Sequence, residues 1–183
     1  LDNLLTGKKE NIKPFLKKIR FIKKSVEDEK LLLKEFKNAD VIIHLAALPS
    51  VPRSIKEPVI SDKMNINGTV CVFEAAKKTG KKVVYASSSS VYGDLKTLPK
   101  MESHPTSFLS FYALQKLTDE KYASLYNSIF GCDFVGMRFF NVFGPRQDPN
   151  SEYSAVIPKF IKMIKEGKTP TIYGDGKTSR DFT

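Results

Sequence analysis

Short runs of apolar residues, separated by longer segments with helical periodicity, constrain the fold of this chain more than any other feature of its sequence. Such runs occupy residues 41–45, 83–86 and 134–139, and a shorter β-rich run occupies residues 19–23. A run without polar alternation is typical of a strand buried on both faces of a parallel sheet, and we expect this of residues 41–45. Strands that alternate with helices form βαβ units, so the sequence predicts an α/β fold with a doubly wound, mostly parallel sheet.

The segments between the runs carry helical signals. Apolar residues at helical spacing mark residues 29–37 and 110–130 as helices. A Pro-containing loop at 49–58 precedes a long helical segment through residue 78, and a further helix is predicted at 155–165. Gly80 and Gly131 follow two of these segments, where a left-handed C-cap would lie. In such a fold the ligand binds outside the carboxyl ends of the strands, so candidate functional residues are sought there.

Charge and cysteine content limit the class of protein. The net charge of +10 comes from scattered lysines without a nucleic-acid-binding motif, so we expect no nucleic-acid partner, although a basic surface suits anionic small molecules. No apolar run reaches the ~20 residues of a membrane helix, so no membrane association is expected. Cys71 and Cys132 have neither metal-ligand nor disulfide-scaffold spacing, which predicts no metal site and a reducing, cytoplasmic location.

A tyrosine four residues before a lysine on a helix places both side chains on one face. The ammonium favours the phenolate and is expected to lower the tyrosine pKa, which creates a general base. The Tyr-x-x-x-Lys pattern occurs three times, at Tyr92, Tyr112 and Tyr173. Gly-Asp follows the first and third tyrosines directly, which indicates loops. Tyr112 and Lys116 are therefore the candidate pair, with a surface pair as the alternative.

A second signal is the run of serines at residues 87–90, directly after the apolar run at 83–86. Serines are poor strand and helix formers, and turn chemistry accounts for one or two of them. At the carboxyl end of a buried strand, a serine hydroxyl can face the ligand crevice. Asp2 is a weaker candidate, because an acid that binds an adenosine ribose follows a glycine-rich turn by about 20 residues, and that turn is absent here.

The strand-end serine precedes the helical Tyr-x-x-x-Lys by 24 residues, and this arrangement resembles the Ser-Tyr-Lys set of short-chain dehydrogenases. With His44-Leu-Ala-Ala47 at the end of the preceding strand, the chain resembles the extended branch of that superfamily, the NAD-dependent epimerase/dehydratase family. The resemblance implies a Rossmann-type fold and NAD as cofactor. Residues 88–91 lack the acid of the dehydratases and decarboxylases and the cysteine of the reductase-epimerases, which leaves 4-epimerase chemistry.

The segments SVPRSI (50–55), FNVFGPRQDP (140–149), AVIP (155–158) and GDGKTSRDF (174–182) look like the UDP-N-acetylglucosamine 4-epimerase group. One departure is Ser25-Val26, where family members usually have an acid before the apolar residue that contacts adenine. The resemblance implies roles position by position. The catalytic residues would be Ser88, Tyr112 and Lys116; the cofactor would be lined by Asp2, Asn3, Leu45, Ala46, Ala47, Tyr112, Lys116 and Phe140; and the substrate by Ser50, Ser88, Ser89, Asn141, Gln147, Ala155, Val156 and Arg180.

The function implied is interconversion of UDP-N-acetylglucosamine and UDP-N-acetylgalactosamine by transient oxidation at C4. A UDP-glucose or UDP-uronic acid 4-epimerase and a non-catalytic dinucleotide-binding homologue remain open, as does the choice of serine within 87–90. Residues 1–140 would form the NAD-binding domain without its first βα unit, and 141–183 the start of the substrate-binding region. We expect a chain cut at both ends that binds NAD poorly by itself and is inactive, and a homodimer of the full-length protein.

Overall fold

The computed structural model describes residues 1–149, 156–172, 174–177 and 179–182. The chain divides into two compact units, Leu1–Arg138 and Phe139–Thr183, which are considered one at a time. The elements, in chain order, are η1 (Lys9–Phe15), α1 (Glu29–Phe36), β1 (Val41–His44), α2 (Val51–Lys56), α3 (Pro58–Asp62), η2 (Lys63–Asn67), α4 (Gly68–Thr79), β2 (Lys82–Ser88), η3 (Ser89–Tyr92), α5 (Phe111–Phe130), β3 (Phe134–Phe139) and α6 (Val156–Lys165).

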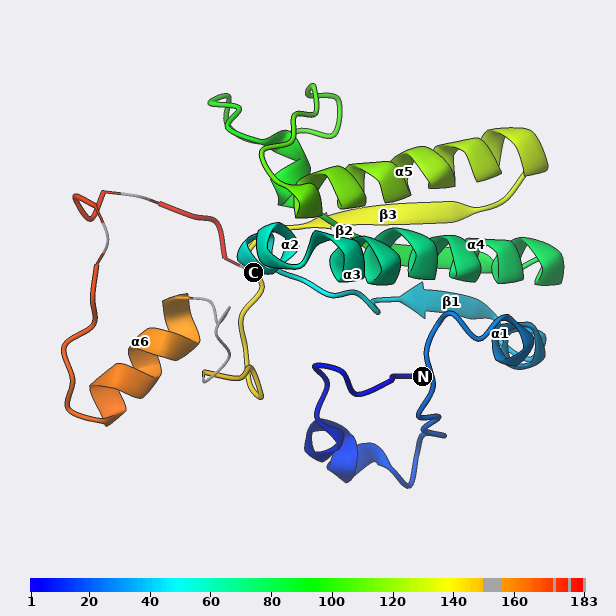
Figure 1. Ribbon diagram of the computed structural model, residues 1–183, viewed down its shortest axis with the longest axis horizontal. Helices are drawn as coiled ribbons and strands as arrows, with labels where there is room; N and C mark the ends of the chain where they lie inside the picture. The colour runs from blue at the N-terminus through cyan, green and yellow to red at the C-terminus, as the bar shows by residue number, and fades with distance from the viewer. Residues whose placement is uncertain (150–155, 173, 178, 183) are drawn as a thin grey trace. The chain divides into compact units, whose positions relative to one another are not determined.

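The sheet of the first unit has three strands in the order β1-β2-β3, and the helices run alongside it (Figure 1). Strands β1 and β2 pair in parallel, with Ile42 opposite Val83 and His44 opposite Tyr85. These four side chains are buried, whereas Ile43, between two of them, is 70% exposed. The prediction that residues 41–45 are buried on both faces is therefore wrong, because α4 and α5 cover one face of the sheet and leave the alternate residues of β1 outside the core.

Aromatic residues from the helices and strands meet at the centre of the core. Phe73 of α4 is fully buried and stacks on Phe134 of β3 with 4.7 Å between ring centroids. Its ring also meets Tyr85 of β2 and Tyr126 of α5 edge-on. A Cβ atom at Gly136 would lie 2.6 Å from the Tyr85 ring, so glycine permits this close approach of β3. The core thus fixes the sheet against the two helices that carry the candidate site.

The predicted helix ends are confirmed at two glycines. Gly80 and Gly131 follow α4 and α5 in the left-handed conformation, with φ of 64° and 65°. Ser110 caps the start of α5, where its hydroxyl accepts a hydrogen bond from the Ala113 N–H. The long helix predicted through residue 78 is instead three consecutive pieces, α3, the π-helical η2 and α4. The π-helical turn lies where Asn65 enters the buried network described below.

Two local predictions are wrong. Residues 19–23 form no strand, although Lys23 makes a single parallel bridge with Asp2. Within the loop predicted at 49–58, residues Val51–Lys56 form α2, because the Ser50 hydroxyl caps this turn by accepting from the Arg53 N–H and Pro52 lies in its first turn, where no N–H is needed.

The second unit contains α6 and two segments that meet at a parallel bridge between Asn141 and Phe182. The rings of Phe143 and Phe182 pack edge to face there, with centroids 6.2 Å apart. Helix α6 begins at Val156, so Ala155, at the start of the predicted helix, lies outside the described residues.

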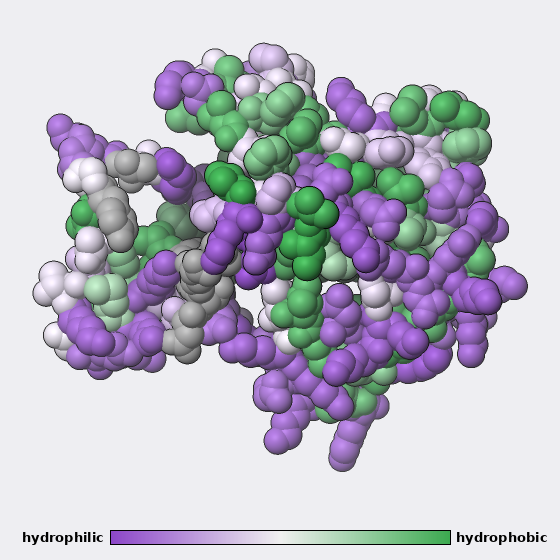
Figure 2. All heavy atoms as spheres, in the orientation of Figure 1, coloured by the Kyte–Doolittle hydropathy of each residue, from purple (hydrophilic) through white to green (hydrophobic). Residues whose placement is uncertain are grey.

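Hydrophilic side chains predominate on the face shown in Figure 2, with hydrophobic side chains exposed between them. None of the helices in the described part of the chain combines the length and the apolar composition needed to cross a bilayer. In the same residues, no three His, Cys, Asp or Glu side chains gather in a way that could hold a metal ion. Cys71 and Cys132 are unpaired thiols.

Candidate active site

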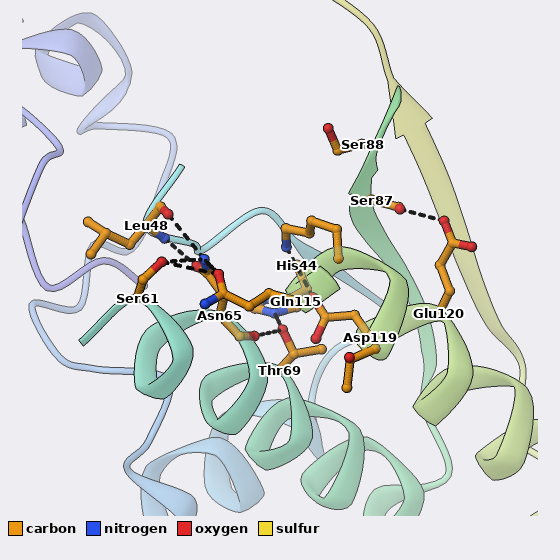
Figure 3. A network of polar contacts seen from close by, with 12 residues as sticks. His44, Leu48, Ser61, Asn65, Thr69, Ser87, Ser88, Gln115, Asp119 and Glu120 are labelled. Atoms are coloured by element: carbon orange, nitrogen blue, oxygen red, sulfur yellow. Dashed lines mark hydrogen bonds and ion pairs between the residues drawn. The ribbon is translucent and has the colours of Figure 1, made fainter. Parts of the chain in front are cut away.

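The carboxyl end of β2 presents two neighbouring serines in different environments. Side chains alternate along a strand, and Ser87 is buried against α5, where its hydroxyl donates to Glu120 Oε1 at 2.5 Å (Figure 3). Ser88 caps the short helix η3, and its Oγ accepts from the Ser90 N–H at 3.2 Å and the Ser90 hydroxyl at 2.9 Å. Since both bonds are accepted, the single Ser88 proton remains for another acceptor.

The phenol of Tyr112, in the first turn of α5, interacts with the Ser88 side chain. The backbone N–H of Tyr112 donates to Ser54 Oγ at 3.1 Å, which docks the start of α5 on α2. Burial raises the pKa of the phenol above its ordinary value, the Ser88 hydrogen bond acts to lower it, and the Asp119 carboxylate raises it further. The structure therefore brings together the predicted serine and tyrosine, and identifies Ser88 as the serine in contact with the phenol.

Lys116 is buried one turn along α5, and its ammonium lies 3.2 Å from Asp119 Oδ2. The sequence predicted that this ammonium lowers the Tyr112 pKa. That prediction is wrong for the structure described, because the Tyr112 pKa is raised and the Lys116 charge is neutralised by an adjacent carboxylate. Asp119 was missed in the sequence; the signal was present, because an acid three residues after a lysine shares its helical face.

A buried polar network supports this corner of the site (Figure 3). The Asn65 side chain accepts from the Leu48 N–H at 2.7 Å and donates to the Leu48 carbonyl at 3.1 Å, so it secures the chain just beyond β1. Asn65 also donates to Gln115 Oε1 at 2.8 Å, and Ser61 donates to the same oxygen at 3.1 Å. Because Gln115 precedes Lys116 on α5, the network ties the position of Lys116 to the loop after β1.

A second cluster fixes the serine end of β2. Arg138 of β3 donates to both carboxylate oxygens of Glu120, at 2.9 and 2.7 Å, and its guanidinium stacks over the Tyr92 ring at 4.8 Å. Glu120 in turn accepts the Ser87 proton. The pair therefore joins β2, β3, α5 and η3 behind the site. Sequence reasoning missed both residues, although an arginine in the apolar run at 134–139 was a usable signal.

Four of the predicted cofactor-binding residues, Asp2, Asn3, Ala46 and Ala47, line one pocket, together with Ser25 and Val26. A carboxylate and a hydroxyl beside two alanines fit an adenosine, because the carboxylate can accept from ribose hydroxyls and the small side chains let the ligand approach the backbone. Asp2 already accepts from the Leu4 N–H at 2.6 Å, which fixes its orientation. The residues present thus fit NAD. Leu45, at the end of β1, is 62% exposed and lines the adjoining cleft.

The remaining predicted residues are dispersed. Ser50 caps α2 with an unusual φ of 126°, and Ser89 begins η3. In the second unit, the Asn141 amide donates to the Asp181 carbonyl at 2.8 Å, so the segment that carries Arg180 lies beside Asn141. Arg180 itself donates to the Ser179 carbonyl at 2.8 Å, and Gln147 to the Val142 carbonyl at 3.4 Å. Phe140 and Val156 also belong to this unit, and Ala155 is outside the described residues.

Known proteins are similar to this chain in sequence and in fold. The chain is 41% identical over 185 residues to a putative UDP-glucose 4-epimerase of Methanocaldococcus jannaschii, an alignment that covers 100% of this chain and 59% of that protein. A solved UDP-N-acetylglucosamine 4-epimerase from Methanobrevibacter ruminantium, in complex with UDP-N-acetylmuramic acid, superimposes with a TM-score of 0.95 at 46% identity over 100% of this chain and 59% of that one.

A UDP-glucose 4-epimerase of Thermus thermophilus, solved with NAD, gives a TM-score of 0.86 at 31% identity, over 99% of this chain and 60% of that one. The chain therefore spans about 59% of the length of the first relatives it matches. The family model described as NAD dependent epimerase/dehydratase family matches residues 1–183. This match and the similarity to solved epimerases show that the chain belongs to the NAD-dependent epimerase/dehydratase family and has its Rossmann-type fold.

Proposed function

We propose that the protein is an NAD-dependent 4-epimerase of a UDP-sugar, and that its substrates are UDP-N-acetylglucosamine and UDP-N-acetylgalactosamine. The observation that carries the proposal is the placement of Ser88 at the end of β2, where it interacts with the Tyr112 phenol of the helix that also carries Lys116. It supports the assignment of a proton donor and a proton acceptor beyond the carboxyl end of β2. The hexosamine preference is supported by the 46% identity to the Methanobrevibacter enzyme.

In this reaction Tyr112 acts as the general base on the sugar 4-hydroxyl, and Ser88 hydrogen-bonds the same oxygen. NAD, when bound, supplies reversible hydride acceptance, which allows C4 to be oxidised and then reduced from the opposite face. Tyr112 is half-buried, and the lower local dielectric strengthens its interaction with Ser88. Asp2, Asn3, Leu45, Ala46 and Ala47 would hold the adenosine end of the cofactor, and Tyr112, Lys116 and Phe140 its nicotinamide end.

The substrate-binding assignments belong to the same proposal. Arg180 matches a diphosphate, since a guanidinium can bind phosphate oxygens bidentately. Asn141 would hold the sugar diphosphate, and Gln147, Ala155 and Val156 the uridine. Ser50 and Ser89 would contact the sugar. The proposal keeps the division expected from the sequence, in which residues 1–140 bind NAD and residues 141–183 begin the substrate-binding region.

The second candidate function is a UDP-glucose 4-epimerase, because the M. jannaschii relative carries that name. Incubation of the full-length protein with each UDP-sugar, followed by NMR detection of the C4 epimer, distinguishes the two. We expect equilibration of the N-acetylhexosamine pair. Turnover of UDP-glucose or a UDP-uronic acid alone would reassign the substrate. Absence of any epimer with all of these sugars would favour a non-catalytic dinucleotide-binding homologue.

The proposal includes a homodimer of the full-length protein and a cytoplasmic location. An apolar stripe on the outer face of α5 supports the homodimer. Leu125 and Ile129 are 54% and 64% exposed there, and Leu114 and Tyr122 continue the stripe toward the start of the helix. Two unpaired cysteines, Cys71 and Cys132, suit a reducing compartment.

A further inference from the structure

Lys116 and Asp119 form an ion pair that is almost completely removed from solvent. Their side chains are 3% and 0% exposed, and Lys116 Nζ lies 3.2 Å from Asp119 Oδ2. The other carboxylate oxygen, Asp119 Oδ1, is buried and has no hydrogen-bond partner among the described residues. A buried carboxylate usually has several hydrogen bonds, so the ammonium is the main stabilising contact of this charge.

The Thr69 side chain also interacts with this carboxyl and, like Lys116, acts to lower the pKa of Asp119. The Thr69 hydroxyl donates its only proton to the Asn65 carbonyl at 2.6 Å. His44 Nε2 lies 3.0 Å from the same Thr69 oxygen, so His44 must donate and Thr69 must accept. Burial, assisted by the Lys116 charge, lowers the pKa of His44 to about 3, so His44 is neutral. Lys116 is therefore the cation that compensates the charge of Asp119, and Thr69 is a further, uncharged contact.

Two acidic groups on one face of α5 can compete for this cation. Tyr112 precedes Lys116 by one helical turn, and Asp119 follows it by three residues. We propose that Asp119 is a positioning residue of the active site, whose carboxylate holds the Lys116 ammonium away from the Tyr112 phenol and so sets the pH at which that phenol loses its proton. The inference deepens the proposed function and rests on it for the role of Tyr112.

The electrostatics support this competition. Burial raises the pKa of Asp119 to about 7, against the opposing effects of Lys116 and, less strongly, of Thr69. The Asp119 charge is also one of the factors that raise the pKa of Tyr112. When Asp119 is ionised, the ammonium is neutralised and the phenol keeps its proton. When Asp119 is neutral, the ammonium is left without an anion and favours the phenolate, so the two groups titrate as a coupled pair.

Other charged or titratable groups also face this cluster. Glu120 of α5 raises the pKa of Asp119, and Asp119 in turn raises that of Tyr85 on β2. Glu120 is bound to Arg138 of β3, so its charge is compensated locally. On β1, His44 stays neutral. Lys116 is therefore the cation for which Asp119 and Tyr112 compete.

The test replaces the charge and retains the shape, with Asp119→Asn in the full-length protein. The phenolate absorbance of Tyr112 is titrated in NAD-free protein as the difference between each protein and its Tyr112→Phe counterpart. We expect the midpoint to move to lower pH by about one unit, which is a tenfold change in the phenolate fraction. The acid limb of the kcat/KM profile should move in the same direction. An unchanged or raised midpoint would overturn the proposal.

Asp133→Asn is the matched control, because Asp133 is an exposed carboxylate paired with Lys82, with a 62% exposed side chain. The Tyr112 titration midpoint of the Asp133→Asn protein should equal that of the wild type. A purely structural role of Asp119 would lower stability and leave the midpoint in place, which contradicts the proposal. Should Asp119→Asn fail to fold, Asp119→Ser removes the same charge.

A measurement on wild-type protein is independent of both variants. The ¹³C signal of the Asp119 carboxyl should titrate in two steps, and Tyr112→Phe should abolish the step at higher pH; a single unaltered step in both proteins would overturn the proposal. Neither the absorbance titration nor the ¹³C titration requires the protein to turn over a substrate. If Asp119→Asn shifts the Tyr112 midpoint but the protein epimerises no UDP-sugar, only the proposed function is disproved. If the protein epimerises a UDP-sugar but Asp119→Asn does not shift the midpoint, only the role of Asp119 is disproved.

Discussion

The Ser87 hydroxyl lies 2.5 Å from Glu120 Oε1 and donates a hydrogen bond to it. Its neighbour Ser88, on the other side of the strand, contacts the Tyr112 phenol instead. Substitutions of these two adjacent serines should therefore have different effects on activity and stability. Ser87 supports the scaffold behind the candidate site, and Ser88 lies beside the proposed general base.

Ser88→Ala should lower kcat by about 10²–10³-fold, because it removes a hydrogen bond to the reacting oxygen. Ser87→Ala should leave kcat close to wild type and lower the free energy of unfolding by about 1–2 kcal/mol, since it removes a bond to a charged carboxylate. Steady-state kinetics and urea unfolding of both full-length variants check this. A larger kcat loss for Ser87→Ala than for Ser88→Ala would reverse the assignment.

Tyr112→Phe should reduce kcat by about 10²–10⁴-fold, because it removes the general base and retains the ring. NAD affinity, measured by calorimetry, should change little. Tyr126→Phe is the control. It removes a hydroxyl that donates to Glu74 at 2.6 Å in the core, so stability should fall and turnover should persist. Normal turnover by Tyr112→Phe would disprove the role of this residue.

Glu120→Gln should lower the free energy of unfolding by about 3 kcal/mol, because the half-buried Arg138 charge loses its carboxylate. The exposed pair Lys82–Asp133 offers a comparison, in which Lys82→Ala should change stability by less than ~1 kcal/mol. Burial acts to raise the pKa of Glu120, but hydrogen bonds from Arg138 and Ser87 hold it below its ordinary value. The stabilisation is therefore complete above the pKa of about 4.3 in the unfolded chain, and is lost as pH falls through the lower folded value. Denaturant titrations from pH 7 to pH 3 measure both effects, and equal losses for the two pairs would contradict this reading.

His44 and Asp119 should give opposite pH dependences of stability. The His44 pKa is lowered from 6.5 to about 3, so lowering the pH through this range protonates the unfolded state and destabilises the fold. The Asp119 pKa is raised from 3.8 to about 7, so lowering the pH through that range protonates the native state and stabilises the fold.

His44→Gln removes the pH dependence of stability that comes from His44 and leaves the one that comes from Asp119. Relative to wild type, its free energy of unfolding should rise as pH is lowered from 6.5 to 4, with a slope difference of up to ~1.4 kcal/mol per pH unit. Denaturant midpoints across this range measure the slope, and His104→Gln, in the loop before α5, is the matched control. Parallel stability curves for His44→Gln and wild type would show that His44 does not become buried and neutral on folding.

Leu125→Asp should convert the full-length protein from dimer to monomer, because it places a charge on the exposed apolar stripe of α5. Sedimentation at several protein concentrations measures the change. Lys30→Glu, on the exposed side of α1, alters charge without touching the stripe and should leave the assembly unchanged. A wild-type protein that is monomeric at all concentrations would remove the dimer from the proposed function.

Much of the local structure could be predicted, because it depends on neighbours in the chain. The bounds 134–139 of the third strand, the helix Phe111–Phe130 with its cap Ser110, and the left-handed glycines at 80 and 131 all follow from periodicity and capping. The predictions for residues 19–23 and 49–58 were wrong, because pairing and capping partners decided those segments. The one-sided burial of β1 likewise depended on which helices cover the sheet.

By itself the sequence determined the types and order of most elements and singled out Tyr112, Lys116 and a serine within residues 87–90 as catalytic candidates, since a strand-end serine and a helical Tyr-x-x-x-Lys are local patterns. Only the tertiary structure decided which charged side chains lie next to each other. It paired Lys116 with Asp119 in a buried site, and the Tyr112 pKa rises rather than falls. The physical reason is that a pKa depends on burial and on the nearest charges in space, and folding sets both.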